Sequence, residues 1–579
     1  MIAKQDDDGL AGPGTSPIGD HRPIRVVCIG AGYSGLMMAI IAEQKMKNHN
    51  VDFQVYEMNE DLGGTWLVNR YPGCQCDIPA HNYAYSFAPN PSWPNYYATS
   101  EQIHTYMKDV ATKYDCDKYI AYGHKVTSAV WSEPSAKWVL TVQNKDKDFS
   151  DTCDVLINAG GVLNNWTWPK IDGIEKFKGK LLHSAEWDEA YDWAGKRVAV
   201  IGIGSSGIQI VPKVAQTAGH VDFFVRSSTW ISPAPGISEP TPEDPDVDEE
   251  YNYAPHELEH FASDPIYSQQ HRKFLANKRI ENFKLSMSGS KAQNETDQLF
   301  RKTMLDRLGS GEKGKAIAKW LLPDFPVGCR RLTPGPGFLE ALIRDNVDSH
   351  WDAIKCITET GIQLKEGSHI KVDAIFCATG FDTTFRPRFP LIGRGGVNLA
   401  ERWSKEDPEA YFSIAVPDMP NYFMFIGPNS PISNGSLVQA IQMTGVYIYR
   451  CITKLQCHAI KSMMISKQVT REYNDYSQQW LSKAVWAAPC RSWYKRGTKD
   501  GRVVAVYAGS CYHFAEALRD PRWEDYELEY VDLHGKFGRF SWLGNGFTKR
   551  EMLGKSVADT QTLNFEDYWN LMVLPEIHY

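Results

Sequence analysis

The stretch IRVVCIGAGYSGLMMAI, residues 24–40, decides the fold of the N-terminal part of the chain. Its first six residues are apolar enough for a buried strand, and a helical pattern follows the glycines. Gly30 permits a tight turn, Gly32 lets the main chain approach a pyrophosphate, and Gly35 lets the helix pack on the strand. A second strand, DFQVYE, ends at Glu57, where an acid can accept the ribose hydroxyls. The stretch therefore predicts a dinucleotide-binding βαβ unit rather than a purely structural glycine turn.

A second stretch with the same glycine spacing, RVAVIGIGSSGIQI, occupies residues 197–210 and is followed by the strand HVDFFVRSSTW. Where the first unit has Glu57, this strand ends in Arg226 and Ser227. A guanidinium can hold a 2′-phosphate bidentately whereas a carboxylate would repel it, so NADPH is expected here rather than NADH. The alternative is an ordinary surface arginine at a strand end. The residues expected at this second site are Gly202, Gly204, Ser205, Ser206, Gly207, Arg226 and Ser227.

Two nucleotide folds in one chain indicate one bound electron carrier and one exchangeable electron donor. A loop rich in Gly, Trp and Tyr, DLGGTWLVNRYPG, follows the first fold and has the composition to lie along an isoalloxazine ring. Two later strands, VLINAGG and VDAIFCATGFD, end in small residues, as strands do where a large cofactor crosses their carboxyl ends. The first nucleotide is therefore expected to be FAD, and the second NADPH, which delivers hydride to it.

The expected fold class is α/β, with two Rossmann-like dinucleotide-binding domains, for FAD and NADPH, and a helical insertion. A flexible segment is expected over 1–23, the first part of the FAD-binding domain over 24–155, and the NADPH-binding domain over 156–377. The insertion would occupy 236–325, opening with the acidic, proline-rich SEPTPEDPDVDEE and continuing with the helix-favouring HRKFLANKRIENFKL. The remaining FAD-binding part and a C-terminal extension would fill 378–579, irregular and rich in aromatic residues near its end.

Composition narrows the partners and the compartment. A net charge of −8 argues against nucleic acid as a partner. No apolar run is long enough to span a membrane, and the polar N-terminus lacks the apolar region of a signal peptide. The 12 cysteines are scattered without a CxxC pair, which is typical of reduced, buried thiols in a cytosolic protein. We therefore expect a cytoplasmic monomer or weak homodimer without a metal site.

Between the two glycine units lies FKGKLLHSAEWD, residues 177–188, whose spacing fits neither a helix stripe nor a strand alternation. It matches the fingerprint F-x-G-x-x-x-H-x-x-x-W-[PD] of the type I Baeyer–Villiger monooxygenases, within the class B flavin-dependent monooxygenases, which the chain resembles over residues 24–530. GGTWLVNRYPG matches a second signature of that family. Related N-hydroxylating and sulfur-oxidising flavoenzymes share the glycine turns but not this connector. By this resemblance His183 couples NADPH position to the flavin site and is not a base.

The resemblance implies that NADPH reduces FAD, that the reduced flavin traps O2 as a C4a-peroxide, and that this attacks a ketone, which rearranges to an ester or lactone. FPVGCRRLTPGPGF resembles the family's arginine segment and implies Arg331 as the catalytic arginine, because a permanently protonated guanidinium stabilises an oxyanion. Arg330 would bind the NADPH 2′-phosphate, and Asp77 would orient Arg331. Without the resemblance, the two arginines would be interpreted as a solvated turn and Asp77 as a helix cap.

Further cofactor contacts follow from the same resemblance. Trp493 in CRSWYK is expected to cover the nicotinamide, core packing being the alternative for one Trp among 18. Ser436 would line the flavin in a segment, NSPISNGSL, that is shorter than in family members acting on small ketones. The expected FAD contacts are Gly30, Gly32, Gly35, Glu57, Gly64, Thr65, Trp66, Gln75, Cys76, Asp77, Tyr83 and Ser436.

The C-terminal segment YAGSCYHFAEALRDPRWEDYELEY resembles the family branch that acts on steroids and other multi-ring ketones. A bulky ketone of secondary metabolism and O2 are therefore the expected substrates. Three other functions stay open. Oxygenation of sulfur or nitrogen would depend less on Arg331, and a reductase would pass electrons from NADPH to a partner. A non-catalytic nucleotide sensor is the last alternative, against which the presence of both Arg331 and Asp77 argues.

Overall fold

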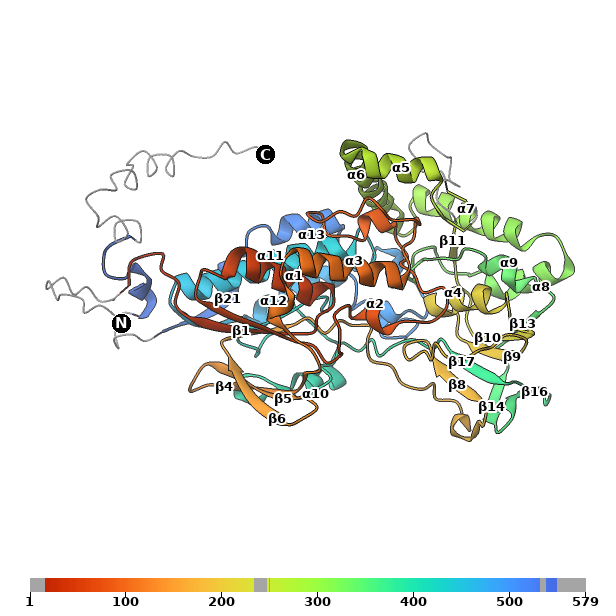
Figure 1. The fold of residues 1–579 in the computed structure, drawn as a ribbon, viewed down its shortest axis with the longest axis horizontal. Helices are drawn as coiled ribbons and strands as arrows, with labels where there is room; N and C mark the ends of the chain where they lie inside the picture. The colour runs from red at the N-terminus through yellow and green to blue at the C-terminus, as the bar shows by residue number, and fades with distance from the viewer. Residues whose placement is uncertain (1–15, 234–246, 249, 532–537, 549–579) are drawn as a thin grey trace.

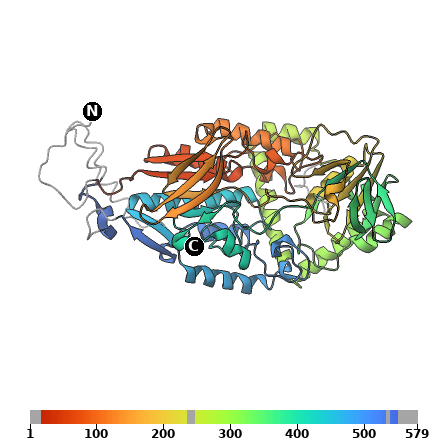
Figure 2. The same ribbon diagram turned by 90° about the horizontal axis from the view of Figure 1, so that it is seen from below.

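The computed structural model describes residues 16–233, 247–248, 250–531 and 538–548. Figure 1 shows two α/β halves along the longest axis, with a group of helices at one end of the upper side. Seen from below, the N-terminal strands and the C-terminal helices fill one half, and the middle of the chain fills the other (Figure 2). No helix in the described ranges is both long enough and apolar enough to cross a membrane.

The first half is built on a five-stranded parallel sheet in the order β19-β7-β1-β2-β3. Helices α1 and α11 pack on each other beside this sheet, so the central strands are buried and read as apolar runs. The last strand of this sheet in chain order, β19, pairs with β7 although more than two hundred residues separate them. The bounds are β1 Ile24–Ile29, α1 Tyr33–Ile41, β2 Val51–Tyr56, β3 Ile120–Ala121, β7 Val155–Asn158, β19 Tyr422–Met424 and α11 Leu437–Cys457.

The second half has its own five-stranded parallel sheet, in the order β13-β10-β9-β17-β8. Strand β8 covers Lys180–His183, so four residues of FKGKLLHSAEWD form a sheet edge. The expectation that this stretch is only a connector is wrong in that part, because a four-residue strand is too short to show an alternating pattern. The other bounds are β9 Arg197–Ile201, α4 Ser205–Val214, β10 His220–Val225, α9 Phe338–Leu342, β13 Val347–Trp351 and β17 Ala374–Cys377.

Smaller sheets and a helical group complete the two halves. A sheet in the order β18-β4-β5-β6 adjoins the first half, and an antiparallel sheet β14-β15-β16 adjoins the second. Most of the acidic SEPTPEDPDVDEE segment, 238–250, lies outside the described residues. The helical group that follows consists of α5 Pro255–Ser263, α6 Pro265–Glu281, α7 Lys291–Leu308 and α8 Glu312–Leu321. The strands are β4 Lys125–Ser132, β5 Lys137–Gln143, β6 Asp148–Cys153, β14 Ile354–Thr358, β15 Gly361–Leu364, β16 His369–Lys371 and β18 Leu391–Ile392.

The described part after residue 457 contains strands and α-helices that the sequence does not predict, whereas residues 482–510 hold only two short 3-10 turns and agree with the predicted irregular structure. Strands β20 and β21 pair antiparallel, and α13 packs against α11. The buried residues of α12 follow a helical spacing from Thr470 to Leu481. The many aromatic residues in this part of the sequence make that spacing hard to recognise. At the other terminus, Ile18 donates its N–H to Phe547, and residues 1–15 of the expected flexible segment lie outside the described ranges. The bounds are β20 Ile460–Ile465, α12 Lys467–Leu481, α13 Cys511–Leu518 and β21 Tyr526–Tyr530.

Candidate functional site

The first glycine turn joins β1 to α1 with no room for side chains at two of its positions. A Cβ on Gly30, whose φ is +100°, would lie 2.8 Å from the carbonyl oxygen of Ala159, and one on Gly35 would lie 1.8 Å from that of Gly30. Gly32 faces Gly64, whose Cα lies 3.7 Å from the position of a Cβ on Gly32. The predicted flavin loop therefore closes over the predicted pyrophosphate turn.

Glu57 and the aromatic residues of the flavin loop lie around this turn. Glu57 follows β2, is 3% exposed, and accepts the N–H of Ala31 at 2.7 Å, which fixes its carboxylate beside the turn. Thr65 and Trp66 begin the short helix α2, Thr65–Val68, and the Trp66 ring meets the Tyr83 ring edge-on at 5.3 Å. A fixed carboxylate beside a glycine turn and a wall of rings are the features that FAD requires.

The second glycine turn repeats this construction between β9 and α4. Gly202 has a φ of +114°, and a Cβ on Gly207 would lie 1.9 Å from the Gly202 carbonyl oxygen. Gly204 is different, because nothing lies within 4 Å of the position of its Cβ. That open space beside the start of α4 fits the approach of a pyrophosphate. Ser205, on the first turn of α4, bonds Thr333 through their hydroxyls at 2.7 Å, and Ser206 lines the same space.

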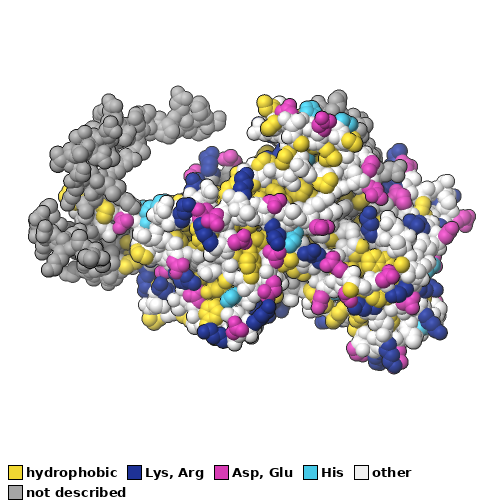
Figure 3. All heavy atoms as spheres, in the orientation of Figure 1, with side chains coloured by type: hydrophobic (Ala, Val, Ile, Leu, Met, Phe, Trp, Pro, Cys, Tyr) yellow, Lys and Arg dark blue, Asp and Glu magenta, His cyan; other side chains and the backbone are white. Residues whose placement is uncertain are grey.

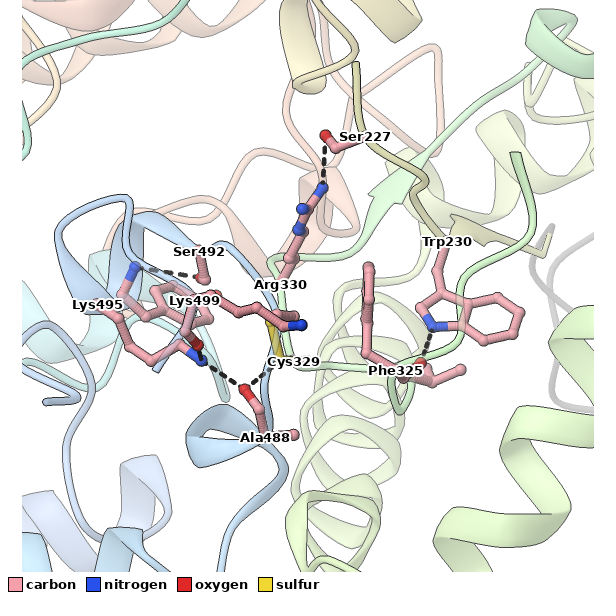
Figure 4. The surroundings of a disulfide bond; sticks show 12 residues. Ser227, Trp230, Phe325, Cys329, Arg330, Ala488, Ser492, Lys495 and Lys499 are labelled. Atoms are coloured by element: carbon pink, nitrogen blue, oxygen red, sulfur yellow. Dashed lines mark hydrogen bonds between the residues drawn. A yellow bond between two sulfur atoms is a disulfide. The ribbon is translucent and has the colours of Figure 1, made fainter. Parts of the chain in front are cut away.

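The residues expected at a 2′-phosphate come together beyond β10. Arg330 donates from Nη1 to the Ser227 hydroxyl at 3.1 Å and to the Ser228 carbonyl at 2.9 Å, and Figure 4 shows its side chain directed toward Ser227. Its Nε is buried without a hydrogen-bond partner. Burial and the charge of Arg491 lower the pKa of Arg330. A phosphate placed between Arg226 and Arg330 would supply the missing acceptor and offset this repulsion.

A cavity of about 1390 Å³ extends from the predicted flavin loop to the second glycine turn, whereas the expected FAD contacts Gly30, Gly32, Gly35, Glu57 and Gly64 do not line it. It takes residues from the flavin loop, from the second glycine turn, and from the segments before and after Arg331. The volume and the mixture of rings, main-chain donors and cations fit the reacting ends of two dinucleotides. The expected residues that line it are Thr65, Trp66, Gln75, Cys76, Asp77, Tyr83, Gly202, Gly204, Ser205, Ser206, Arg226, Ser227, Arg330, Arg331 and Trp493.

A glutamine that the sequence does not single out ties the two halves together at this cavity. Gln209 on α4 accepts the hydroxyl of Tyr71 at 2.8 Å and donates to the carbonyl of Gln75 at 3.0 Å. Tyr71 and Gln75 belong to the flavin loop and its continuation, whereas Gln209 follows the second glycine turn. No local signal marks such a residue, because its partners lie well over a hundred positions away in the chain.

Arg331 and Asp77 form a bidentate ion pair in the wall of the cavity. Arg331 donates from Nε and from Nη2 to the two carboxylate oxygens, the second at 2.7 Å, and from Nη1 to the carbonyl of Ile432 at 2.6 Å. The side chains are 31% and 17% exposed to the cavity, so the pair is accessible to a small molecule. The structure therefore brings together the two side chains that the sequence predicts as partners.

The pair holds both of its members in their charged forms. Burial alone would raise the pKa of Asp77, but the adjacent Arg331 guanidinium outweighs it and holds that pKa below its usual value. Burial likewise opposes the charge on Arg331, and the Asp77 carboxylate raises its pKa above the ordinary value. Nearby, burial raises the pKa of Tyr494 to about 12, so this phenol is neutral and remains a donor.

The remaining expected residues take different places. Cys76 is buried, its thiol directed to the Ile78 carbonyl at 3.1 Å, and burial raises its pKa. Trp493 reaches the cavity and packs beside Tyr494, with 4.8 Å between ring centroids. Ser436 is 2% exposed and donates its hydroxyl to the Asn82 carbonyl at 2.6 Å. It does not line the cavity, whereas its neighbours on either side do.

His183 lies at the end of β8, fully buried. Its ring stacks on Trp166 at 4.2 Å, and its Nε2 lies 3.3 Å from the hydroxyl of Thr379, at the carboxyl end of β17. Burial lowers the pKa of His183 to about 4, so the ring is neutral at physiological pH. A neutral, stacked imidazole that touches the loop after β17 fits a coupling role better than that of a proton-transfer base.

A disulfide joins the loop before Arg330 to the segment before Trp493. Cys329 and Cys490 are bonded with 6.5 Å between their Cα atoms, although 161 residues separate them in the sequence (Figure 4). The expectation of reduced thiols is therefore wrong for these two and agrees with the ten free cysteines. The sequence could not show the bond, because only the folded chain brings the two segments together.

A second cavity, of about 440 Å³, adjoins the first at Asp77, Arg330 and Arg331. Its wall includes the helical group and the residues around Trp486 and Tyr494. Arg279, near the end of α6, also lines it, although it belongs to no recognisable sequence motif. The Arg331–Asp77 pair thus stands where the large nucleotide-sized cavity meets a smaller one of the size of an organic substrate.

Comparison with known proteins relates the chain to flavin-dependent monooxygenases. The sequence model of the family described as Flavin-binding monooxygenase-like matches residues 23–237. The chain is 38% identical over 550 residues to the FAD-binding monooxygenase moxY of Dothistroma septosporum, covering 93% of this chain and 84% of the relative. It is 30% identical over 519 residues to a Baeyer-Villiger monooxygenase of Pseudomonas aeruginosa, covering 88% and 93%. The NADP⁺-bound cyclohexanone monooxygenase of Rhodococcus sp. Phi1 has the same fold, with a TM-score of 0.74 at 22% identity, covering 88% of this chain and all of that one.

Proposed function

This chain belongs to the flavin-binding monooxygenases of the Baeyer–Villiger type, and on that premise we propose that it uses FAD, NADPH and O2 to insert one oxygen atom beside the carbonyl of a multi-ring ketone. The product is an ester or a lactone. The observation that supports this reaction is the Arg331–Asp77 pair, which lines the nucleotide-sized cavity and the adjoining smaller cavity at once. In this proposal the large cavity holds the reacting ends of the two nucleotides, and the smaller one holds the ketone.

The two nucleotide sites fit their cofactors on structural grounds. The turn at Gly30, Gly32 and Gly35, with Glu57 fixed beside it, would hold FAD. The turn at Gly202 and Gly207, with the unsatisfied Nε of Arg330, would hold NADPH. We assign residues 24–155, and 378–579 with its C-terminal extension, to the FAD-binding part and 156–377 to the NADPH-binding part, where residues 156–158 complete strand β7 of the first sheet. A bound flavin reduced by NADPH supplies, with O2, the oxygen atom that is inserted.

Arg331 stabilises the negative charge that develops on the substrate oxygen. Its guanidinium is permanently protonated, and Asp77 and the Ile432 carbonyl fix its plane, so little reorganisation is needed during the reaction. Removing one such donor from an oxyanion site typically costs about 100- to 1,000-fold in rate. Asp77 supplies orientation and charge balance to Arg331, and it stays ionised throughout because its pKa is held low.

Rings and main-chain donors around the pair keep water away from the reacting atoms. Trp66, Tyr83 and Tyr494 are largely buried and lie on the cavity wall near Arg331. A drier cavity strengthens the attraction between the guanidinium and an oxyanion. The cavity of about 440 Å³ favours a substrate of several rings over a single small ring. We also propose that the protein acts in the cytoplasm, which the ten free cysteines support and the Cys329–Cys490 disulfide does not.

The proposal is tested by following the fate of O2 in Arg331→Ala. The wild-type protein should convert a bicyclic or steroidal ketone to an ester or lactone that carries one atom of ¹⁸O from ¹⁸O2, with one NADPH consumed for each product. Arg331→Ala should still accept electrons from NADPH but form product at least about 100-fold more slowly. Ester formation at an unchanged rate in this variant would refute the role of Arg331.

The same assay separates the alternative functions. A sulfur or nitrogen oxygenase would oxidise thioethers or amines in both proteins, with little dependence on Arg331. A reductase would consume NADPH and release hydrogen peroxide whichever ketone is supplied. Replacing Lys273, an exposed residue on α6 outside both cavities, provides a control for the loss of a positive charge.

A further inference from the structure

The wall of the smaller cavity carries more cationic than anionic side chains, which is unusual for a site that binds an uncharged ketone. Its wall carries four cations, Lys278, Arg279, Arg330 and Arg331, against one carboxylate, Asp77. The whole chain has a net charge of −8, so this excess of positive charge is local. Asp77 already receives two hydrogen bonds from Arg331, and Arg330 is bonded to the serines after β10. Asp77 therefore acts on Arg279 only as a nearby charge, without an ion pair.

Arg279 is half-buried beside the cavity, and its guanidinium has few partners. Its Nε is buried without any hydrogen-bond partner, and its Nη2 lies 3.5 Å from the Gly435 carbonyl, at the limit of a hydrogen bond. No carboxylate among the described residues forms an ion pair with it, since the salt bridges around this cavity are confined to Arg331 and Asp77. Buried guanidinium groups are normally paired, so an unsatisfied one beside a cavity indicates a missing acceptor.

The position of Arg279 is fixed by the chain around it. It lies two residues before the end of α6, and its own carbonyl accepts the side-chain amide of Asn434 at 3.1 Å. A cation in the last turn of a helix is ordinarily placed there for the helix dipole, and such a side chain extends into solvent. The preceding residue, Lys278, is half-buried at the edge of the same cavity, and its ammonium lies over the Phe274 ring. Arg279 is instead directed inward, close enough to Asp77 and Arg331 for their charges to act on it.

We propose that Arg279 binds an oxygen anion on the substrate, a carboxylate or an ionised phenol, while Arg331 faces the ketone carbonyl. This inference rests on the proposed function and adds the chemical class of its substrate. The wall of the same cavity includes Tyr96, Tyr97 and Trp486, all largely buried. These rings suit a flat aromatic body. The substrate is therefore an acidic, multi-ring aromatic ketone whose acid group lies away from the carbonyl that reacts.

The test is a binding measurement that does not require turnover. The full-length, FAD-loaded protein with NADP⁺ is titrated calorimetrically with three probes of similar size: an acetylnaphthoate, an acetylnaphthol and the uncharged acetylnaphthamide. The wild-type protein should bind the naphthoate, or the naphthol above its pKa, at least about tenfold more tightly than the amide, the size expected for one charged hydrogen bond. The naphthoate and naphthol arms distinguish a carboxylate from a phenolate. Equal affinity for all three probes would overturn the proposal.

Three variants test whether Arg279 is the residue that makes the protein prefer the anionic probes. Arg279→Met should bind all three probes equally, Arg279→Lys should keep part of the preference for the anion, and Lys273→Met should behave as the wild type. A preference that survives in Arg279→Met would overturn the proposal. If Arg279→Met fails to fold, as flavin content and melting would reveal, Arg279→Gln serves in its place, and the wild-type comparison still decides.

Turnover distinguishes this inference from the function on which it rests. If the amide is oxygenated as efficiently as the naphthoate, the ketone reaction stands and the role of Arg279 fails. If the naphthoate binds more tightly through Arg279 but no probe is oxygenated, the anion site stands and the proposed function fails for this class of ketone. The ratio of kcat/KM for the naphthoate and the amide should fall about tenfold in Arg279→Met.

Discussion

At the residue scale, the negative charge of Asp77 offsets the free-energy cost of placing the Arg331 guanidinium in the wall of the cavity. Asp77→Asn would preserve the shape of the site but leave the guanidinium with the Ile432 carbonyl as its main remaining partner. Breaking a buried pair by removing one partner costs about 3–5 kcal/mol. We expect Asp77→Asn to lower the free energy of unfolding in urea by roughly that amount, with ketone oxygenation lost in parallel.

The loss of unfolding free energy in Asp77→Asn should depend on pH, and the lowered pKa of Asp77 fixes the direction of that dependence. Because the pKa of Asp77 is lowered on folding, its contribution is present above the ordinary carboxyl pKa of about 3.9 and is lost as the pH falls further. The gap in unfolding free energy between wild type and Asp77→Asn should thus be constant near neutrality and shrink below about pH 4. A gap that is unchanged at acid pH would contradict the assignment of the ion pair.

His183 gives a second prediction with its own pH window. Its pKa falls from 6.5 to about 4 in the folded chain, so the unfolded chain binds the extra proton between these values. Folding stability therefore decreases as the pH falls from 6.5 to about 4. His183→Phe keeps a ring against Trp166 and should remove the part of the pH dependence of folding stability that comes from His183. Thermal melts of the wild type and the variant between pH 6.5 and about 4 measure this difference. Parallel curves for the two proteins would show that His183 is not protonated on unfolding.

At the element scale, the glycine turns predict a separation between folding and binding. In Gly207→Ala the new methyl would lie 1.9 Å from the Gly202 carbonyl oxygen, so α4 could not pack on β9 and the protein should melt at a lower temperature. Gly204→Ala meets nothing within 4 Å and should melt as the wild type does. Its methyl would nevertheless occupy the space of the pyrophosphate, so the KM for NADPH should rise about tenfold or more. Steady-state kinetics and melting curves measure both effects.

The matched pair carries its own control. If Gly204→Ala changes stability as much as Gly207→Ala, the open space beside α4 is not a ligand site. If neither variant alters the KM for NADPH, the second glycine turn is not where this cofactor binds. Flavin content should be normal in Gly204→Ala, because the first glycine turn is a separate element.

The elements that could be predicted from the sequence are those encoded by short, continuous stretches of it. The two glycine turns, with their strands and helices, need only about thirty consecutive residues each, and their pattern predicts them directly. Arg331 and Asp77 could be paired only through the family resemblance, since 254 positions separate them. Gln209 and Arg279 could not be predicted at all. Each acts through partners from distant parts of the chain, and neither belongs to a motif.

At the scale of the whole molecule, acidic and basic side chains are interspersed over the face shown in Figure 3. The excess of positive charge around Arg279 lies on the wall of the smaller cavity. The Cys329–Cys490 disulfide is the other long-range feature, and it links the loop of Arg331 to the segment of Trp493. A native disulfide typically contributes about 2–4 kcal/mol by restricting the unfolded chain.

Loss of this disulfide should therefore weaken the folded state without changing its sheets. We expect Cys329→Ser, and the wild type in excess dithiothreitol, to lose about 2–4 kcal/mol of unfolding free energy. Cys356→Ser, at a free and only partly buried cysteine, is the matched control and should melt as the wild type does. If dithiothreitol destabilises Cys329→Ser as much as the wild type, another bond is responsible.

The same bond makes part of the polypeptide a covalent ring. Residues 330–489 contain β13 and β17 of the second sheet and β19 of the first, so the ring passes through both halves. A protease that cuts once within this interval cannot release a fragment while the bond is intact. The cut protein should migrate as one species near 65.5 kDa without a thiol and as two pieces after reduction. A loop that opens for a bulky substrate could therefore be severed without the two halves coming apart.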